Sequence, residues 1–253
     1  MQNSSTGNPK LKWIILIAAV VVILIVAVFA IVKFAGIGKN GASVALVKGM
    51  QVTEKTFHGS EFNDADQVIV VTAKSLNTWD AHLETYQKYD GKWYRGLSVV
   101  SKIGSAGLAY DNKRIEGSMT TPIGIYDLPY AFGVKKNPGT KMPYRIVDEN
   151  TYYDGQYGSK TYNKLVQGQP ANNEYEYMFS PAYLYGVDIG FNPEQKVGKG
   201  NGIFLHCFTD AGKTAGCVSI SKSDIVKVLK WITPTAKPKI LICLDSALHS
   251  YLS

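Results

Sequence analysis

The chain begins with a segment that can fold in only a few ways. From Trp13 to Val32 it runs WIILIAAVVVILIVAVFAIV, twenty residues without a charged side chain. About 20 apolar residues, each rising 1.5 Å in a helix, cover the roughly 30 Å hydrocarbon core of a bilayer. A helix also satisfies its own backbone hydrogen bonds there. We therefore predict a transmembrane signal anchor over residues 13–35, behind a cytoplasmic tail of residues 1–12.

A cleaved signal peptide is the alternative for this segment. The stretch Val28-Phe29-Ala30 has the small residues of a cleavage site. The apolar core of a signal peptide is usually only about 7–15 residues long, so the longer run favours an uncleaved anchor. Both alternatives deliver the rest of the chain across a membrane. We expect the remainder to be extracytoplasmic, held at the cell membrane by a single pass.

The charge of the chain argues against one class of partner. The net charge is +7, of which residues 1–12 carry +2 and residues 67–253 carry +5, because residues 33–66 balance four lysines against four acids. No segment gathers lysine and arginine densely enough for a nucleic-acid groove. We expect no nucleic-acid partner.

Beyond the anchor, the composition favours a β-rich domain. Residues 36–66 are rich in glycine and polar residues and indicate a stalk or linker, and the globular domain is expected over residues 67–253. The 16 tyrosines and 24 glycines of the chain favour strands and turns. Strand-like runs occur at VIVVTA (68–73), within GSMTTPIGIYDLP (117–129), and at VDIGF (187–191), GIFLHCF (202–208) and KPKILICLD (237–245).

Turn and helix signals complete this outline. Asp90-Gly91 between tyrosine-rich arms predicts a hairpin. SKSDIVKVLKWITP (221–234) predicts one amphipathic helix, capped by Ser221 or Ser223. The stretch 137–181 has little periodicity, so we expect irregular chain there, which forms an ordered lid or substrate-binding insertion. The predicted fold is mainly β with few helices, after a single N-terminal transmembrane helix.

Cys217 is the cysteine with the most distinctive setting. The chain has three cysteines and four histidines, without the spacing of a zinc site, and we expect no metal and no cofactor. The sequence TAGCVSISKSD places Cys217 between a glycine loop and the predicted helix. Glycine before it lets the backbone turn tightly. Proximity to a helix N-terminus predicts a stabilised, reactive thiolate.

His206 is the candidate base for this thiol. It lies eleven residues upstream at the end of a predicted strand, and the loop that follows can double back to bring imidazole beside thiol. Nucleophilic cysteine catalysis requires such a pair, and backbone amides near Gly216 could stabilise an oxyanion. A lone cysteine and a lone histidine are more often structural. The residues alone leave both interpretations open.

The segment from His206 onward resembles the catalytic segment of the L,D-transpeptidase (YkuD-type) family. That pattern has a histidine, a spacer, and Ser/Thr-His-Gly-Cys followed by a hydrophobic and a polar residue. Thr214, Gly216, Cys217 and Val218 match it. TTPIGIY (120–126) resembles the family's Thr-Pro-x-Gly turn and the following strand, and PYAFGVKKNPGTKMPYR (129–145) resembles a branch of exported bacterial relatives. The likeness runs from about Gln67 to Asp245.

Three features depart from the family pattern. Ala215 stands where its second histidine is common, Ser219 replaces the usual Arg or Asn, and the spacer from His206 is short. The resemblance implies that Cys217 attacks, that His206 acts as base, and that amides near Gly216 form the oxyanion hole. The Cys207 carbonyl is expected to orient nearby groups.

The resemblance also implies a fold, a substrate and a reaction. The implied fold is a mixed β-sandwich or barrel-like domain with the helix packed on it. The implied partners are peptidoglycan stem peptides, and the implied reaction is thioester-mediated transpeptidation giving 3→3 cross-links, with L,D-carboxypeptidase activity as one alternative. A non-catalytic cell-wall-binding protein is the other, and it predicts a buried, unreactive Cys217. A disulfide between Cys207 and Cys243 stays open.

Overall fold

The computed structural model describes residues 47–171 and 173–253. Residues 49–253 form one compact unit. The predicted tail and the predicted anchor over residues 13–35 lie outside the described residues. Within the described residues, no helix has the length and apolarity needed to span a bilayer.

Two β-sheets organise the described part of the chain. The larger has twelve strands in the order β5-β6-β15-β2-β3-β4-β14-β13-β12-β7-β8, with β1 paired to β4, and the smaller has the order β10-β9-β11. The bounds are β1 (Gln51–Thr53), β2 (Gln67–Ala73), β3 (Asp80–Tyr89), β4 (Lys92–Lys102), β5 (Leu108–Tyr110), β6 (Thr121–Asp127), β7 (Ala131–Gly133), β8 (Tyr144–Ile146), β9 (Thr151–Asp154), β10 (Lys164–Gln167), β11 (Tyr175–Tyr177), β12 (Gly186–Asp188), β13 (Phe204–Cys207), β14 (Val218–Ile220) and β15 (Lys239–Leu244).

The centre of the large sheet follows from the longest apolar runs. β2 is buried along almost its whole length and pairs in parallel with β15 and antiparallel with β3. The predicted hairpin is confirmed, because β3 and β4 pair antiparallel across Asp90 and Gly91. Both turn residues have positive φ, 50° and 72°, as a type I′ turn requires. The prediction of a mainly β domain is confirmed, with a sheet that mixes parallel and antiparallel pairs.

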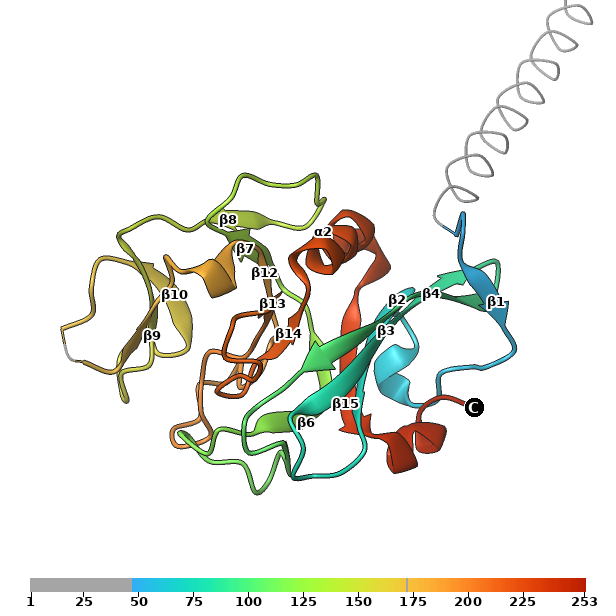
Figure 1. Cartoon of the computed structure of the whole chain (residues 1–253), viewed down its shortest axis with the longest axis horizontal. Helices are drawn as coiled ribbons and strands as arrows, with labels where there is room; N and C mark the ends of the chain where they lie inside the picture. Colours follow the sequence, from blue (N-terminus) through green and yellow to red (C-terminus); the bar gives the residue numbers. More distant parts are fainter. Residues whose placement is uncertain (1–46, 172) are drawn as a thin grey trace, which may run out of the picture. The chain divides into compact units, whose positions relative to one another are not determined.

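The predicted helix is also confirmed as α2 (Lys222–Trp231), the only α-helix in the described ranges. Ser221 caps it, since its side chain accepts a hydrogen bond from the Asp224 amide. The buried face carries Ile225, Val228 and Leu229, which pack into the main core. Figure 1 shows α2 beside the part of the sheet that contains β13 and β14. Short 3-10 helices occur at Ser60–Phe62, Pro181–Tyr183, Pro234–Ala236 and Asp245–Ser250.

The stretch 137–181 is less irregular than its sequence indicates. It contains β8 and the three strands of the small sheet, which lies at the left of Figure 1. These strands have only three or four residues each, too short for an alternating apolar pattern to be recognised. Tyrosine contacts join them, such as Tyr152 with Tyr175 at 5.1 Å between ring centroids. The expectation of irregular chain was therefore wrong here, and the lid or substrate-binding role of the stretch stays a prediction.

Residues 51–66, expected in a stalk, are part of the folded unit. β1 pairs with β4, and Phe57 and Phe62 are buried in a second apolar cluster. The Phe57 ring packs on Trp93 at 4.7 Å, and the Thr56 amide bonds the carbonyl of Ser253 at 2.7 Å. The scattered aromatic residues in this segment follow no strand or helix period, which is why the sequence indicated a linker.

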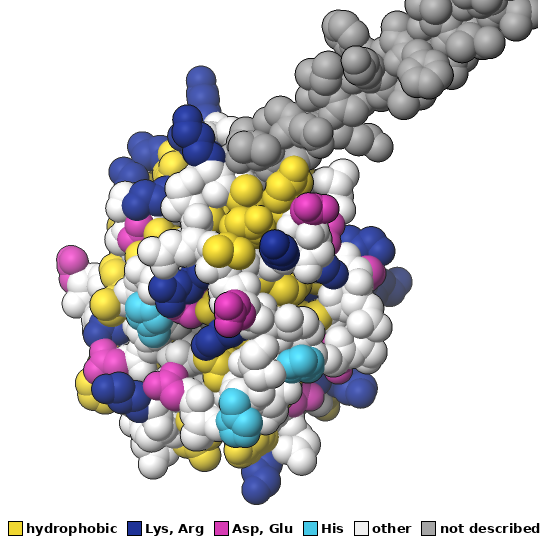
Figure 2. Space-filling model, turned by 90° about the vertical axis from the view of Figure 1, so that its right-hand side faces the viewer, with side chains coloured by type: hydrophobic (Ala, Val, Ile, Leu, Met, Phe, Trp, Pro, Cys, Tyr) yellow, Lys and Arg dark blue, Asp and Glu magenta, His cyan; other side chains and the backbone are white. Residues whose placement is uncertain are grey.

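On the face in Figure 2, basic side chains are scattered among acidic and neutral ones.

Candidate active site

Two neighbouring strands bring the predicted nucleophile and base together. β13 and β14 are parallel, and His206 pairs with Ser219. Side chains alternate between the two faces of a strand, so Cys217, two residues before Ser219, is on the same face as His206. Leu205 and Val218 point to the other face and join the main core. The loop between the strands therefore doubles back as predicted.

A tight turn precedes Cys217. The Gly216 φ angle is 143°, and a Cβ there would lie 3.0 Å from the carbonyl oxygen of Thr120. The Thr214 hydroxyl accepts from the Gly216 amide at 3.1 Å and donates to the Cys217 carbonyl at 2.6 Å. The Gly216 amide already has this hydrogen-bond partner. The amides of Ala215 and Cys217 are therefore the candidate oxyanion donors that remain in the turn.

A second threonine holds this turn from a distant segment. Thr121 begins β6, and its hydroxyl donates to the Gly216 carbonyl at 2.8 Å. The same oxygen accepts from the Gly104 amide at 2.8 Å. The TTPIGIY segment thus contacts the turn that carries Cys217.

The His206 ring is held in one tautomer. Its Nδ1 lies 2.8 Å from the carbonyl oxygen of Cys207, which can only accept, so Nδ1 carries the hydrogen. In the neutral ring, Nε2 is then the acceptor. The expectation that the Cys207 carbonyl orients a neighbour is confirmed. Tyr183 packs edge-on against the imidazole, 5.4 Å between centroids. Burial lowers the His206 pKa to about 4, so the ring is neutral at pH 7.

Cys217 is more buried than a reactive thiol usually is. Its side chain is 7% exposed, and its sulfur lies 3.3 Å from both the Phe204 amide, which donates to it, and the Gly202 carbonyl, to which the thiol donates. Burial raises the thiol pKa well above its usual range, with the Glu176 carboxyl adding to the effect. The predicted helix-stabilised thiolate is wrong: β14 separates Cys217 from α2, which begins at Lys222.

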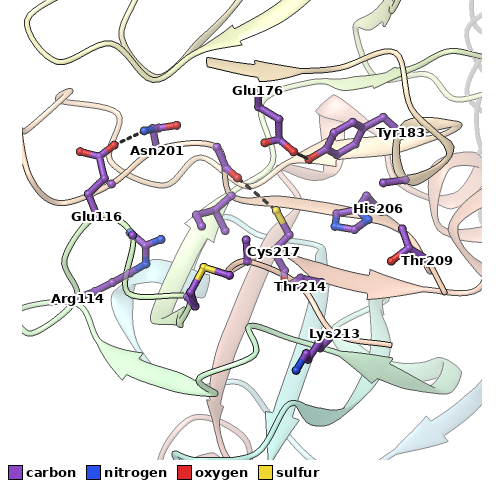
Figure 3. A pocket seen from close by; sticks show the side chains of 17 residues that line it. Arg114, Glu116, Glu176, Tyr183, Asn201, His206, Thr209, Lys213, Thr214 and Cys217 are labelled. Atoms are coloured by element: carbon purple, nitrogen blue, oxygen red, sulfur yellow. Dashed lines mark hydrogen bonds between the residues drawn. The ribbon is translucent and has the colours of Figure 1, made fainter. Parts of the chain in front are cut away.

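Cys217 and His206 line one cavity of about 350 Å³. Figure 3 shows the Cys217 sulfur between His206 on one side and Arg114 on the other. Several elements that are far apart in the sequence contribute to the walls, including Arg114, Glu116, Met119, Glu176, Tyr183, Asn201, Ile203, Thr209, Lys213, Thr214 and Ala215.

The sequence analysis did not identify three side chains of this cavity, those of Arg114, Glu176 and Tyr183. Arg114 is 6% exposed and lies in the loop between β5 and β6. Glu176, on β11, accepts a short hydrogen bond from the Tyr183 hydroxyl. Burial raises the Glu176 pKa, although that bond opposes the shift. None of the three belongs to a periodic pattern or a motif, so a single sequence carried no signal for them.

The remaining cysteines lie elsewhere. Cys207 and Cys243 are buried, unbonded, and belong to different apolar clusters. They are not joined as a disulfide in this structure, and both pack as small apolar residues. Over the described ranges there is no group of three or more potential metal-ligating side chains.

Comparisons with known proteins place the chain in one family. The family model of the L,D-transpeptidase catalytic domain (YkuD) matches residues 82–242. No curated protein matches the chain. Among solved structures, the chain is similar to Bd1075 of Bdellovibrio bacteriovorus, with 18% identity and a TM-score of 0.38. That match covers 70% of this chain and 48% of the Bd1075 chain, so this chain spans about half of it. The family match covers more than half of the chain and includes β13, β14 and the loop between them, and the chain therefore belongs to the YkuD family of L,D-transpeptidase catalytic domains.

Proposed function

We propose that the chain is a peptidoglycan L,D-transpeptidase that forms 3→3 cross-links through a thioester on Cys217. The observation that carries this proposal is the shared cavity of Cys217 and His206, in which Nδ1 of His206 is fixed by a carbonyl and Nε2 is left as the acceptor. A neutral imidazole is the form that can take a proton from a thiol. Family membership supports an L,D-transpeptidase type of activity on peptidoglycan.

The first step is acylation. The thiol hydrogen turns from the Gly202 carbonyl to Nε2 of His206 as the sulfur attacks the carbonyl carbon of the third stem residue. A sulfur–carbon bond forms and the carbon–nitrogen bond to the terminal D-residue breaks. The imidazolium returns its proton to the leaving amine. Turn amides next to Cys217 stabilise the oxyanion in between.

The second step decides the product. A side-chain amine of another stem attacks the thioester, loses its proton to His206, and restores the thiol while an amide forms. That acceptor gives the cross-link. Water in place of the amine gives a free carboxylate and makes the protein an L,D-carboxypeptidase.

We further propose that the protein is an integral membrane protein. The uncharged run over residues 13–32 supports a single-pass anchor. The catalytic domain then faces the cell wall, where its substrate is.

A non-catalytic cell-wall-binding protein is the second candidate. The burial of Cys217 favours it, because a thiol with a raised pKa is a poor nucleophile until a base removes its proton. The two candidates share the cavity and differ only in whether the thiol reacts.

The test uses the full chain in detergent with disaccharide-tetrapeptide, followed by mass spectrometry. The transpeptidase gives an acyl-enzyme, loss of a terminal D-amino acid and a dimeric product, all absent in Cys217→Ala. Cys243→Ala, which removes a buried cysteine outside the cavity, keeps all three. Loss of the D-amino acid without a dimer identifies the carboxypeptidase. Binding without an acyl-enzyme identifies the binding protein.

A further inference from the structure

The Arg114 guanidinium is buried and forms no ion pair in the described part of the chain, although the Glu116 carboxyl interacts with it electrostatically from the wall of the same cavity. None of the six ion pairs found there includes it. A buried charge is costly unless it is compensated, so such a group in a cavity is a candidate binding group.

The contacts of Arg114 use only part of its hydrogen-bonding capacity. Nε donates to the Thr120 carbonyl at 3.1 Å and Nη1 donates to the Lys199 carbonyl at 2.6 Å. The guanidinium also stacks over the Phe191 ring at 4.8 Å. Guanidinium has five N–H donors, and Nη2 has no partner among the described residues. The contacts fix the plane of the group and leave the N–H groups of Nη2 available.

Nη2 lies beside Gly216, in the turn that precedes Cys217. A Cβ on Gly216 would be 3.4 Å from Nη2, and one on Gly200 would overlap the guanidinium. Both positions are glycine, so the guanidinium can approach the turn closely. Arg114 and Cys217 line the same cavity, and Figure 3 shows the guanidinium across the sulfur from His206.

We propose that Arg114 binds a free carboxylate of the acyl donor while the scissile carbonyl lies at Cys217. This rests on the proposed function of the cavity as the donor site. The free N–H groups of Nη2, held in a fixed plane, can donate charge-assisted hydrogen bonds to a carboxylate. Two carboxylates of a stem peptide can fill this role, one on the D-glutamyl residue of the retained acyl part and one on the terminal residue that leaves.

Equilibrium binding separates these two sources. The protein is the full chain carrying Cys217→Ala, so that no turnover occurs. The ligands are the tetrapeptide L-Ala-γ-D-Glu-L-Lys-D-Ala, the same peptide with D-isoglutamine in the second position, and the same peptide with a terminal carboxamide. We expect one of the amidated peptides to bind about 10- to 100-fold more weakly than the parent. The amidated peptide that binds more weakly identifies the carboxylate that Arg114 contacts.

Three further substitutions test the residue. We expect Arg114→Gln to lose the preference for the parent peptide over the more weakly bound amidated peptide. It should bind that amidated peptide as tightly as the protein with Arg114 does, which also shows that the variant is folded. Arg145→Gln removes an arginine outside the cavity and keeps the preference. If Arg114→Gln binds none of the peptides, Arg114→Lys tests the proposal instead. Lysine retains the positive charge, so we expect this variant to keep part of the preference for the free carboxylate.

Other outcomes overturn the proposal. For the protein with Arg114, these are equal binding of all three peptides or no binding of the parent peptide. For the variants, they are an unchanged preference for the free carboxylate in Arg114→Gln or no such preference in Arg114→Lys. Loss of the preference in Lys213→Gln, which removes the other cation of the cavity, also contradicts the proposal. Product formation by the wild-type protein is a separate measurement. Its absence, with an intact Arg114-dependent preference, removes the transpeptidase and leaves the carboxylate site.

Discussion

The hydroxyl of Thr121 donates to the carbonyl of Gly216 at 2.8 Å and thereby joins two segments 95 residues apart. The same oxygen accepts from the Gly104 amide, so one side chain connects β6, the segment after β4 and the turn that carries Cys217. Thr121 is fully buried. The position of Cys217 therefore depends on a residue that takes no part in the chemistry.

We predict that Thr121→Val lowers the free energy of unfolding by about 1–3 kcal/mol, because it leaves a buried amide and a buried carbonyl without their partner. Val has nearly the shape of Thr, so packing changes little. Thr121→Ser keeps the hydroxyl and loses only a methyl group. Urea denaturation of both variants measures the difference. Equal losses in the two variants would mean that the hydroxyl does not stabilise the turn.

Gly216 and Gly212 make a matched pair in one loop. Both have positive φ, 143° and 63°, so a side chain is strained at either position. A Cβ on Gly212 meets nothing within 4 Å, whereas one on Gly216 lies 3.0 Å from a backbone oxygen. We predict that Gly216→Ala abolishes acyl-enzyme formation and that Gly212→Ala lowers stability by only about 1 kcal/mol. Intact-protein mass spectrometry and thermal unfolding check the two outcomes. Similar acylation in both variants would contradict the structure of the turn.

Phe57 tests whether residues 51–66 belong to the folded domain. Its side chain is buried between Phe62, Tyr86 and Trp93. We predict that Phe57→Ala lowers the free energy of unfolding by about 3 kcal/mol or more. Val52→Ala is the control, since Val52 is 63% exposed, and such surface changes usually stay within about 0.5 kcal/mol. If chemical denaturation shows a small change in the free energy of unfolding for both variants, residues 51–66 do not stabilise the domain and behave as a stalk.

The parts of the structure that were predictable are those with a local signal. The β2 and β15 runs, the Asp90-Gly91 turn and the capped helix each have a period or a turn residue that reveals them. That Cys217 and His206 reach one cavity was predictable because a short loop joins neighbouring strands. The burial of Cys217 was not, because it is set by side chains from other segments.

Arg114, Glu176 and Tyr183 show the same limit in the site. Arg114 lies in a loop, Glu176 on the short strand β11 and Tyr183 at the end of a 3-10 helix, and only the tertiary fold brings them to the cavity. The small sheet was missed for a related reason: its three- and four-residue strands are stabilised by tyrosine contacts rather than by an alternating pattern. What the sequence predicts well here is local, and what it misses is assembled from distant segments.

His206 gives the last prediction, which concerns pH. Its pKa is about 4 in the folded protein and about 6.5 in an unfolded chain. Between pH 6.5 and pH 4, His206 is protonated in the unfolded chain but not in the folded protein. The unfolded population therefore rises as the pH falls. The stabilising effect of a neutral His206 is complete above pH 6.5 and is lost down to pH 4. Asp188 acts in the opposite direction, because burial raises its pKa to about 6 and the folded protein then holds the proton.

Comparison with His206→Gln isolates the histidine from Asp188, which is present in both proteins. We predict that the unfolding free energy of the wild type, relative to that of His206→Gln, falls by about 3 kcal/mol between pH 7.5 and pH 4. Urea denaturation across this range measures it. A constant difference between wild type and His206→Gln would mean that the imidazole titrates freely, and a freely titrating imidazole is not the buried, neutral base that the proposed mechanism requires.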